Sequence, residues 1–381
     1  MPAQVIAMSA FIVIILTGLL LASACALLGS FLVLRRMAMM ADALSHAILP
    51  GLVAGYFLAQ GPSVLAGFGG ALLAGAVTVT LVEALRSSGR VGDQAAIGIV
   101  FPAMFALGVF ITSRYYEDVH LDTDAVLYGN IEFAPFDVLL INGVNLGPQP
   151  LWVLGALTLL NLGFVTLLYK ELKLATFDPD LAAVMGFSPT LIHYALMLML
   201  SLTTIGAFTA VGAILAVAFL IVPAATAYLL TDDLKAMIGL AVLVGALSAV
   251  IGFFAALALD ASVAGAMATA AGALFALAAL FSPTKGLVAR LRQRLQQRQR
   301  MMVENLVVHL LNHEQRASES AEAEVAHLSS ALRWSPAHAQ RIIRTAMRAG
   351  LIERRADRLL LTEAGRASAQ RALARASADQ R

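Results

Sequence analysis

The chain is dominated by long apolar stretches, and these constrain its fold more than any other feature. A helix that crosses a bilayer needs about 20 mostly apolar residues. Nine stretches approach this length, near residues 9–34, 38–59, 63–85, 95–112, 149–169, 190–208, 210–230, 236–258 and 263–281. Only 13% of the 381 residues are charged, against about 25% in a soluble domain. The sequence therefore predicts an all-α polytopic membrane protein with about nine transmembrane helices.

The basic residues between these stretches predict an orientation. Lys and Arg gather in the cytoplasmic loops of membrane proteins. If the N-terminus lies outside, eight of the nine basic residues of 1–285 fall on the inner side, and only Arg114 falls outside. We therefore expect an N-out, C-in arrangement.

Charge divides the chain into two parts. Residues 1–285 carry a net charge of −6, whereas residues 286–381 contain 17 arginines and carry a net charge of +8. Such asymmetry is typical of two domains in different surroundings. We expect a transmembrane domain over 1–285, a basic juxtamembrane linker over 286–302 and a cytosolic domain over 303–381.

The C-terminal part has the element order of a small α+β domain. Apolar residues at helical spacing follow residue 303, and further helices are expected near 321–332 and 336–348. The segments "LIERR" and "RLLLT" predict a short β hairpin before a last helix. This order is that of a winged helix-turn-helix. Arg341, Arg344 and Arg348 share one helix face, which could contact DNA or serve as a basic face for regulation or protein contact.

One apolar stretch carries an unusual polar group of residues in "MMADALSHAILPG". Asp42 and His46 are spaced i, i+4 and so share a helix face. If this helix starts after Arg36, His46 lies about 15 Å deep, near the middle of a core about 30 Å thick. Ionisable groups at that depth are costly and mark ion paths by default. Carboxylate with imidazole suits Mn, Fe(II) or Zn and disfavours Cu(I).

A structural interpretation of this pair also remains open at this stage. Asp42 could pair with Arg35, and His46 could hydrogen-bond a backbone carbonyl. Elsewhere, His193 lies near the inner end of its span and is interpreted as interfacial. The single cysteine, Cys25, excludes a disulfide framework and is interpreted as a core residue.

Two long loops join the spans. The outer loop, about 113–148, is acidic and could attract divalent cations, dock a binding protein or simply be solvated. The inner loop, about 170–189, predicts a short helix, since Asp178 is a cap followed by Pro179 at the first helical position, and Gly186 can end it. A short helix there is a natural docking surface for a soluble partner.

Several ordered motifs give the chain a family likeness. "MADALSHAILPGLVAG" resembles the signature of the permease subunits of manganese/zinc/iron-type ABC importers. "VGDQAAIGIVFPAMFALGV", "LYGNI" and "FDPDLAAVMGFSP" with "AVGAILAVAFLIVPAATAYLL" are similar to further motifs of this family, in the same order. The likeness covers about residues 1–283. The tail resembles the winged-helix part of iron- and manganese-dependent repressors of the diphtheria-toxin-repressor type.

The resemblance implies a permease subunit in a bacterial cytoplasmic membrane. It implies a second permease copy or a sister permease, an extracytoplasmic metal-binding protein and a cytosolic ATP-binding subunit. The family's ATPase-coupling loop would correspond to Asp178, Pro179, Ala182 and Gly186. The metal (Mn, Zn or Fe) would be cargo, with no permanently bound cofactor, and Asp42 and His46 would be its ligands.

Two other classes compete with this interpretation. In the first, the chain is a membrane-tethered, metal-responsive transcription regulator, although nine spans exceed what a tether needs. In the second, it is an ion-driven secondary transporter. The sequence contains no GxxxxGK[ST] phosphate loop, so the chain is not expected to hydrolyse ATP itself.

Overall fold

The computed structural model describes residues 3–59, 64–115, 131–141, 144–283, 285–315, 334–355 and 358–378. The chain forms two compact units, Met1–Gly286 and Leu287–Arg381. The first unit contains the apolar stretches and the second contains the arginine-rich tail. Each unit has its own apolar core, so each is described by itself.

Within the described residues, nine helical spans are long and apolar enough to cross a membrane, which confirms the number expected. One span is built from two consecutive helices, α2 and α3. The elements are α1 (Ala3–Leu34), α2 (Ala38–Ala47), α3 (Leu49–Ala59), α4 (Val64–Ser87), α5 (Asp93–Tyr115), α7 (Gln149–Leu167), α10 (Pro189–Val211), α11 (Ala213–Leu230), α12 (Leu234–Leu259) and α13 (Val263–Phe281).

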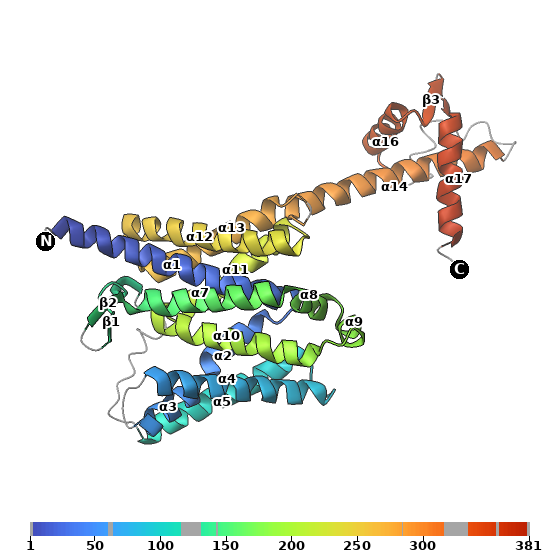
Figure 1. Ribbon diagram of the computed structural model, residues 1–381. Coiled ribbons are helices and arrows are strands. Elements are labelled where there is room, and N and C mark those ends of the chain that lie inside the picture. Colours follow the sequence, from blue (N-terminus) through green and yellow to red (C-terminus); the bar gives the residue numbers. More distant parts are fainter. Residues whose placement is uncertain are drawn as a thin grey trace. The chain divides into compact units, whose positions relative to one another are not determined.

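Helices that are distant in sequence pack side by side in the first unit. α1 lies against α7, α11 and α12, and α10 contacts α2, α4 and α7. Figure 1 shows α1 with α11 to α13 in one group and α2 to α5 in another, with α7 and α10 between them. Phe31, Phe219 and Phe253 are fully buried among these helices. Cys25 is also fully buried, which confirms its interpretation as a core residue.

The second span breaks where its sequence contains a proline. α2 ends at Ala47 and α3 begins at Leu49, with Ile48 between them. Pro50 has no N–H to donate to the carbonyl four residues back, which is that of His46. The span therefore breaks into two helices just beyond Asp42 and His46.

Glycines allow α3 and α4 to touch backbone to backbone. A Cβ atom on Gly51 would lie 2.0 Å from the carbonyl oxygen of Gly70, and one on Gly70 would lie 2.0 Å from that of Gly51. Small residues permit such close approach between membrane helices. These glycines therefore hold α3 against α4.

One end of this bundle gathers basic residues, and we call it the basic end. It contains the C-termini of α1, α4, α11 and α13 and the N-termini of α2, α5, α10 and α12, with the following basic residues: Arg35, Arg36, Arg86, Arg90, Lys170, Lys173, Lys235 and Lys285. The structure thus collects at one end the residues that sequence analysis assigned to the inner loops.

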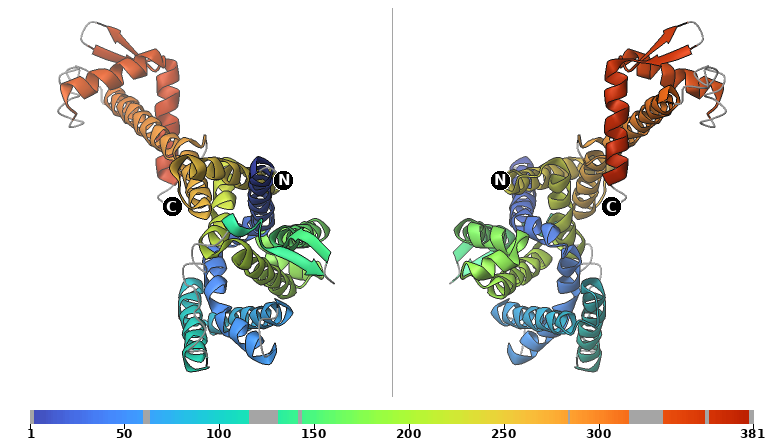
Figure 2. Two further views of the ribbon diagram at one scale, coloured as in Figure 1. Left: turned by 90° about the vertical axis from the view of Figure 1, so that its left-hand side faces the viewer. Right: turned by 90° about the vertical axis from the view of Figure 1, so that its right-hand side faces the viewer.

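The opposite end carries the described part of the acidic loop. A 3-10 turn, η1 (Ile131–Phe133), precedes an antiparallel hairpin of β1 (Val138–Ile141) and β2 (Val144–Pro148). The left view of Figure 2 faces this end, with the hairpin in front of the helices. Glu132 accepts a 2.7 Å hydrogen bond from the backbone N–H of Val263, at the start of α13. Glu117, Asp118, Asp122 and Asp124 lie outside the described residues.

The second unit is built from α14 (Leu287–Gln315), α16 (Pro336–Arg348), β3 (Ile352–Arg355), β4 (Arg358–Leu361) and α17 (Glu363–Ala378). β3 and β4 form an antiparallel hairpin, and Trp334 packs against the core of the unit. Arg366 donates two hydrogen bonds to Glu314, at 2.9 and 3.1 Å, and this carboxylate raises the pKa of Arg366. The helix expected over 321–332 lies outside the described residues, and 286–302 belongs largely to α14.

Gly51 tests the α3–α4 contact. Gly51→Ala should lower the amount of folded protein and its Tm, because the added methyl meets a backbone carbonyl; overpacking costs about 1–3 kcal/mol. Gly69→Ala is the matched control, since a Cβ there meets nothing within 4 Å. Equal melting temperatures for both variants in detergent would contradict the packing described here.

Candidate functional site

Asp42 and His46 face each other on α2, as their spacing predicted. Nε2 of His46 lies 3.8 Å from Oδ1 of Asp42. This separation is too long for a hydrogen bond. Two donors that bind one zinc ion at about 2.0–2.2 Å each in a tetrahedral site are about 3.4 Å apart. The pair is therefore spaced so that one ion could bridge it with little movement.

The pair lies on the open face of α2. Side-chain exposure is 46% for Asp42 and 34% for His46, whereas Ala43, Leu44 and Ala47 are buried against the bundle. Met39 precedes Asp42 by three residues and His46 by seven, so all three share this face. Because the face is uncovered in a single chain, another subunit or a water-filled path can reach both donors.

Two aromatic rings of α5 wall one side of the imidazole. The ring centroid of His46 lies 6.2 Å from that of Phe101 and 5.8 Å from that of Phe105, the latter in an edge-on arrangement. An apolar wall of this kind limits solvent access and strengthens electrostatic interactions inside a site.

The structure gives Arg35 a partner other than Asp42. Its Nε donates a 3.1 Å hydrogen bond to Oγ1 of Thr176, and burial lowers the pKa of this guanidinium. Asp42 instead has His46 as its near neighbour. Arg35 thus ties the turn before α2 to the segment that precedes Asp178.

The inner loop forms two short helices, α8 (Tyr169–Phe177) and α9 (Pro179–Val184). The Asp178 side chain accepts a 2.9 Å hydrogen bond from the N–H of Leu181, as expected for a cap. Gly186 has φ +88°, and the N–H of Phe187 bonds the carbonyl of Ala182, which is the pattern of a Schellman ending. The start and the end expected for this helix from its sequence are both confirmed.

α9 presents apolar side chains outward. Val184 is 85% exposed, and Leu181 and Met185 are also exposed, while Ala182 is fully buried. This short helix thus leaves an exposed apolar surface at the basic end of the bundle.

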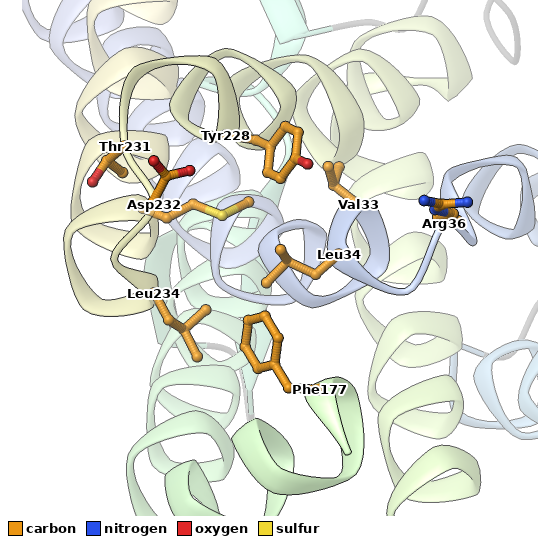
Figure 3. Close-up of a pocket in the computed structure, with 9 residues that line it drawn as sticks. Val33, Leu34, Arg36, Phe177, Tyr228, Thr231, Asp232 and Leu234 are labelled. Atoms are coloured by element: carbon orange, nitrogen blue, oxygen red, sulfur yellow. The ribbon is translucent and has the colours of Figure 1, made fainter. Parts of the chain in front are cut away.

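A cavity of about 440 Å³ lies beside this segment at the basic end. It is lined by residues of the α1 terminus, the α8–α9 junction and the α11–α12 turn. Figure 3 shows the ring of Phe177 directed toward Leu34 and Leu234, with Asp232 on the turn. Nζ of Lys285 lies 2.5 Å from Oδ1 of Asp232, and the two side chains form an ion pair. Neither Asp42 nor His46 lines this cavity, which separates it from the candidate metal pair.

A buried polar link that was not predicted from the sequence joins three helices. Nδ2 of Asn161 on α7 donates to the carbonyl of Ala24 on α1 at 3.1 Å and to Oγ1 of Thr203 on α10 at 2.8 Å. All three helices are apolar spans, where an amide side chain needs a protein partner. The signal was a lone asparagine inside an apolar stretch.

No group of three or more His, Cys, Asp or Glu side chains that could hold a metal ion is found among the described residues. The Asp42–His46 pair therefore supplies two protein ligands from this chain. Zinc sites in proteins usually have four ligands, and catalytic ones three plus water.

This architecture is that of a polytopic membrane protein with a polar pair on one broken span. Residues 8–282 match the ABC 3 transport family, and the chain belongs to this family. It is thus a membrane permease subunit of an ABC transporter rather than an enzyme, and a separate subunit hydrolyses ATP.

Two curated relatives show how far the likeness extends. The zinc transport system membrane protein TroD of Treponema pallidum (strain Nichols) is 46% identical over 357 residues, which cover 94% of this chain and 97% of that protein. The manganese transport system membrane protein MntD of Bacillus subtilis (strain 168) is 46% identical over 277 residues, covering 73% and 94%. The match to TroD therefore extends into the C-terminal unit.

A solved structure has the same fold. PsaBC from Streptococcus pneumoniae, in complex with Fab, superposes with a TM-score of 0.60 at 28% identity, and covers 71% of this chain and 91% of that one. The fold of most of this chain is therefore shared with a protein of solved structure.

Proposed function

We propose that this permease imports a divalent transition-metal ion, Mn, Zn or Fe, and that Asp42 and His46 bind it during passage. One observation carries the proposal: the two donors face each other on α2, 3.8 Å apart, on an uncovered face of the helix. Relatives named for zinc transport and for manganese transport support the class of cargo. One carboxylate and one imidazole suit these ions and leave the choice among them open.

We propose that the pore needs a second permease, either another copy of this chain or a sister subunit. Two ligands hold a divalent ion weakly, and the open face of α2 can meet a partner helix. A second pair of donors, or water, would complete the coordination. Incomplete coordination also suits transport, because the ion must leave the site.

In this proposal the basic end faces the cytosol of a bacterial cell, and α9 docks the ATP-binding subunit there through its exposed apolar side chains. Four residues fix the shape of this docking helix. Asp178 caps its start and Pro179 occupies its first turn. Ala182 is its buried contact, and Gly186 ends it. The β1–β2 end then faces an extracytoplasmic metal-binding protein.

Arg35 links docking to the metal pair in this scheme. Thr176 stands two residues before Asp178, and Arg35 stands three residues before the start of α2. Their 3.1 Å hydrogen bond lets a displacement of α8 and α9 act on the N-terminus of α2. α2 in turn carries Asp42 and His46.

We further propose that the second unit is a cytosolic winged-helix domain with a regulatory role. The order α16, β3, β4, α17 supports this, as does the division of α16 into two faces. Arg341, Arg344 and Arg348 are exposed, whereas Ile342, Ile343 and Ala346 are buried in the core of the unit. The arginine face is then free to contact nucleic acid or an acidic protein surface.

The metal pair is tested by uptake in cells that lack other importers. Asp42→Asn and His46→Asn should each reduce ⁵⁴Mn or ⁶⁵Zn uptake by more than about tenfold, because even the loss of an outer-shell partner costs about 10–100-fold. Asp260→Asn, at an exposed αL position, is the control and should transport normally. Normal uptake by Asp42→Asn or by His46→Asn, at normal expression, would contradict the proposal.

The docking role of α9 is tested by co-purification with the ATP-binding subunit. Val184→Arg should abolish the complex, because a charge replaces an exposed apolar contact. Val144→Arg is matched in chemistry but lies on β2 at the opposite end, and it should leave the complex intact. If the two variants bind the ATPase equally well, α9 is not the docking element.

The role of the tail is tested by charge removal. Replacing Arg341, Arg344 and Arg348 together by Gln should leave transport capacity intact but change how uptake responds to metal supply. The same replacement of Arg290, Arg292 and Arg294, which are exposed on α14, is the control. Identical regulation in wild type and in the first triple variant would exclude a regulatory role for this face.

A further inference from the structure

A second, smaller cavity lies at the basic end beside the start of α2. It measures about 20 Å³, and a cavity needs roughly 10–15 Å³ by this measure to hold one water. Its walls come from α2, α4, α5 and α10, and its polar lining includes Glu83, Gln94 and His193. The space therefore suits one ion or one water molecule.

Two of these groups repeat the chemistry of the Asp42–His46 pair. Nε2 of His193 on α10 lies 3.9 Å from Oε2 of Glu83 on α4. That distance is beyond hydrogen-bond range and about 0.5 Å longer than the separation of two ligands on one tetrahedral ion, so a small movement would let both groups bind it. His193 is 13% exposed and Glu83 34% exposed, so the pair is set into the protein. Gln94, whose side-chain amide contains a carbonyl oxygen, also lines the cavity.

The cavity continues the polar face of α2. Met39 lines it and shares a face with Asp42 and His46. Seven residues separate His46 from Met39, which is about 10 Å along a helix. An ion that leaves the Asp42–His46 pair toward the basic end along this face therefore reaches Glu83 and His193.

Nearby guanidinium groups limit how tightly an ion would be held. Nη1 of Arg86 lies 3.6 Å from Oε2 of Glu83, and Arg36 also lines the cavity. Like charges close to a cation weaken its binding. The arrangement suits a site that an ion passes through rather than one that stores it.

We propose that Glu83 and His193 form a second, transient site for a divalent transition-metal ion, occupied after the Asp42–His46 pair on the way out at the basic end. This inference rests on the proposed metal-import function. The alternative is that Glu83 serves only as the ion-pair partner of Arg86 on the helix surface, and the variants below separate the two.

The test uses the full chain with its partner subunits, purified and reconstituted in nanodiscs, with ⁶⁵Zn²⁺ as the probe. Glu83→Gln with His193→Asn should remove one bound zinc per copy of this chain. It should lower the initial uptake rate about tenfold, with little change in the zinc concentration for half-maximal uptake, because the loading pair is intact. An unchanged zinc content and uptake rate would overturn the proposal.

A variant of Arg86 distinguishes a ligand from an ion-pair partner. Arg86→Gln removes the guanidinium but keeps both donors, so zinc should be retained and bound several-fold more tightly. If Arg86→Gln instead causes the same loss as Glu83→Gln with His193→Asn, the carboxylate acts through the ion pair, and the second site is refuted.

A third variant removes the first pair and leaves the second site intact. The complex with Asp42→Asn and His46→Asn should still bind zinc at Glu83 and His193, and adding His193→Asn should remove it. An assembled complex without any zinc would count against the second site. If the Asp42 and His46 variants transport zinc normally, the proposed role of that pair fails; if only the Glu83 and His193 variants behave as wild type, the second site alone fails.

Discussion

Keeping a carboxylate inside a membrane helix is the constraint on which this structure depends. Placing an aspartate at the centre of a span costs about 2.5–3.5 kcal/mol on insertion scales. The protein meets this by building the span from two short helices and leaving Asp42 and His46 on an uncovered face. The opposite face of α2 packs into the bundle and fixes where the donors point.

The surrounding helices hold that short helix in place from several sides. Glycine contacts let α3 approach α4, and Asn161 joins α7 to α1 and α10. Phe101 and Phe105 of α5 cover one side of His46. These contacts hold the side chains of Asp42 and His46 at a fixed separation.

Polar interactions gather at the basic end. There Arg35 bonds Thr176, just before the capped helix α9, and Glu83 approaches His193 within one small cavity. Docking of a partner, movement of α2 and release of an ion would thus take place within one layer of the bundle. The outer end has a different construction, with a β hairpin and the Glu132 contact to the start of α13.

The sequence by itself determined the nine spans, the start and end of α9 and the shared face of Asp42 and His46. These are local properties, set by apolar length, proline and glycine chemistry and helical periodicity. Only the tertiary structure decided that Arg35 bonds Thr176 rather than Asp42, and that Glu83 meets His193 across 110 residues of sequence. Such pairings depend on which helices become neighbours, and an apolar span carries no local signal for the helix against which it packs.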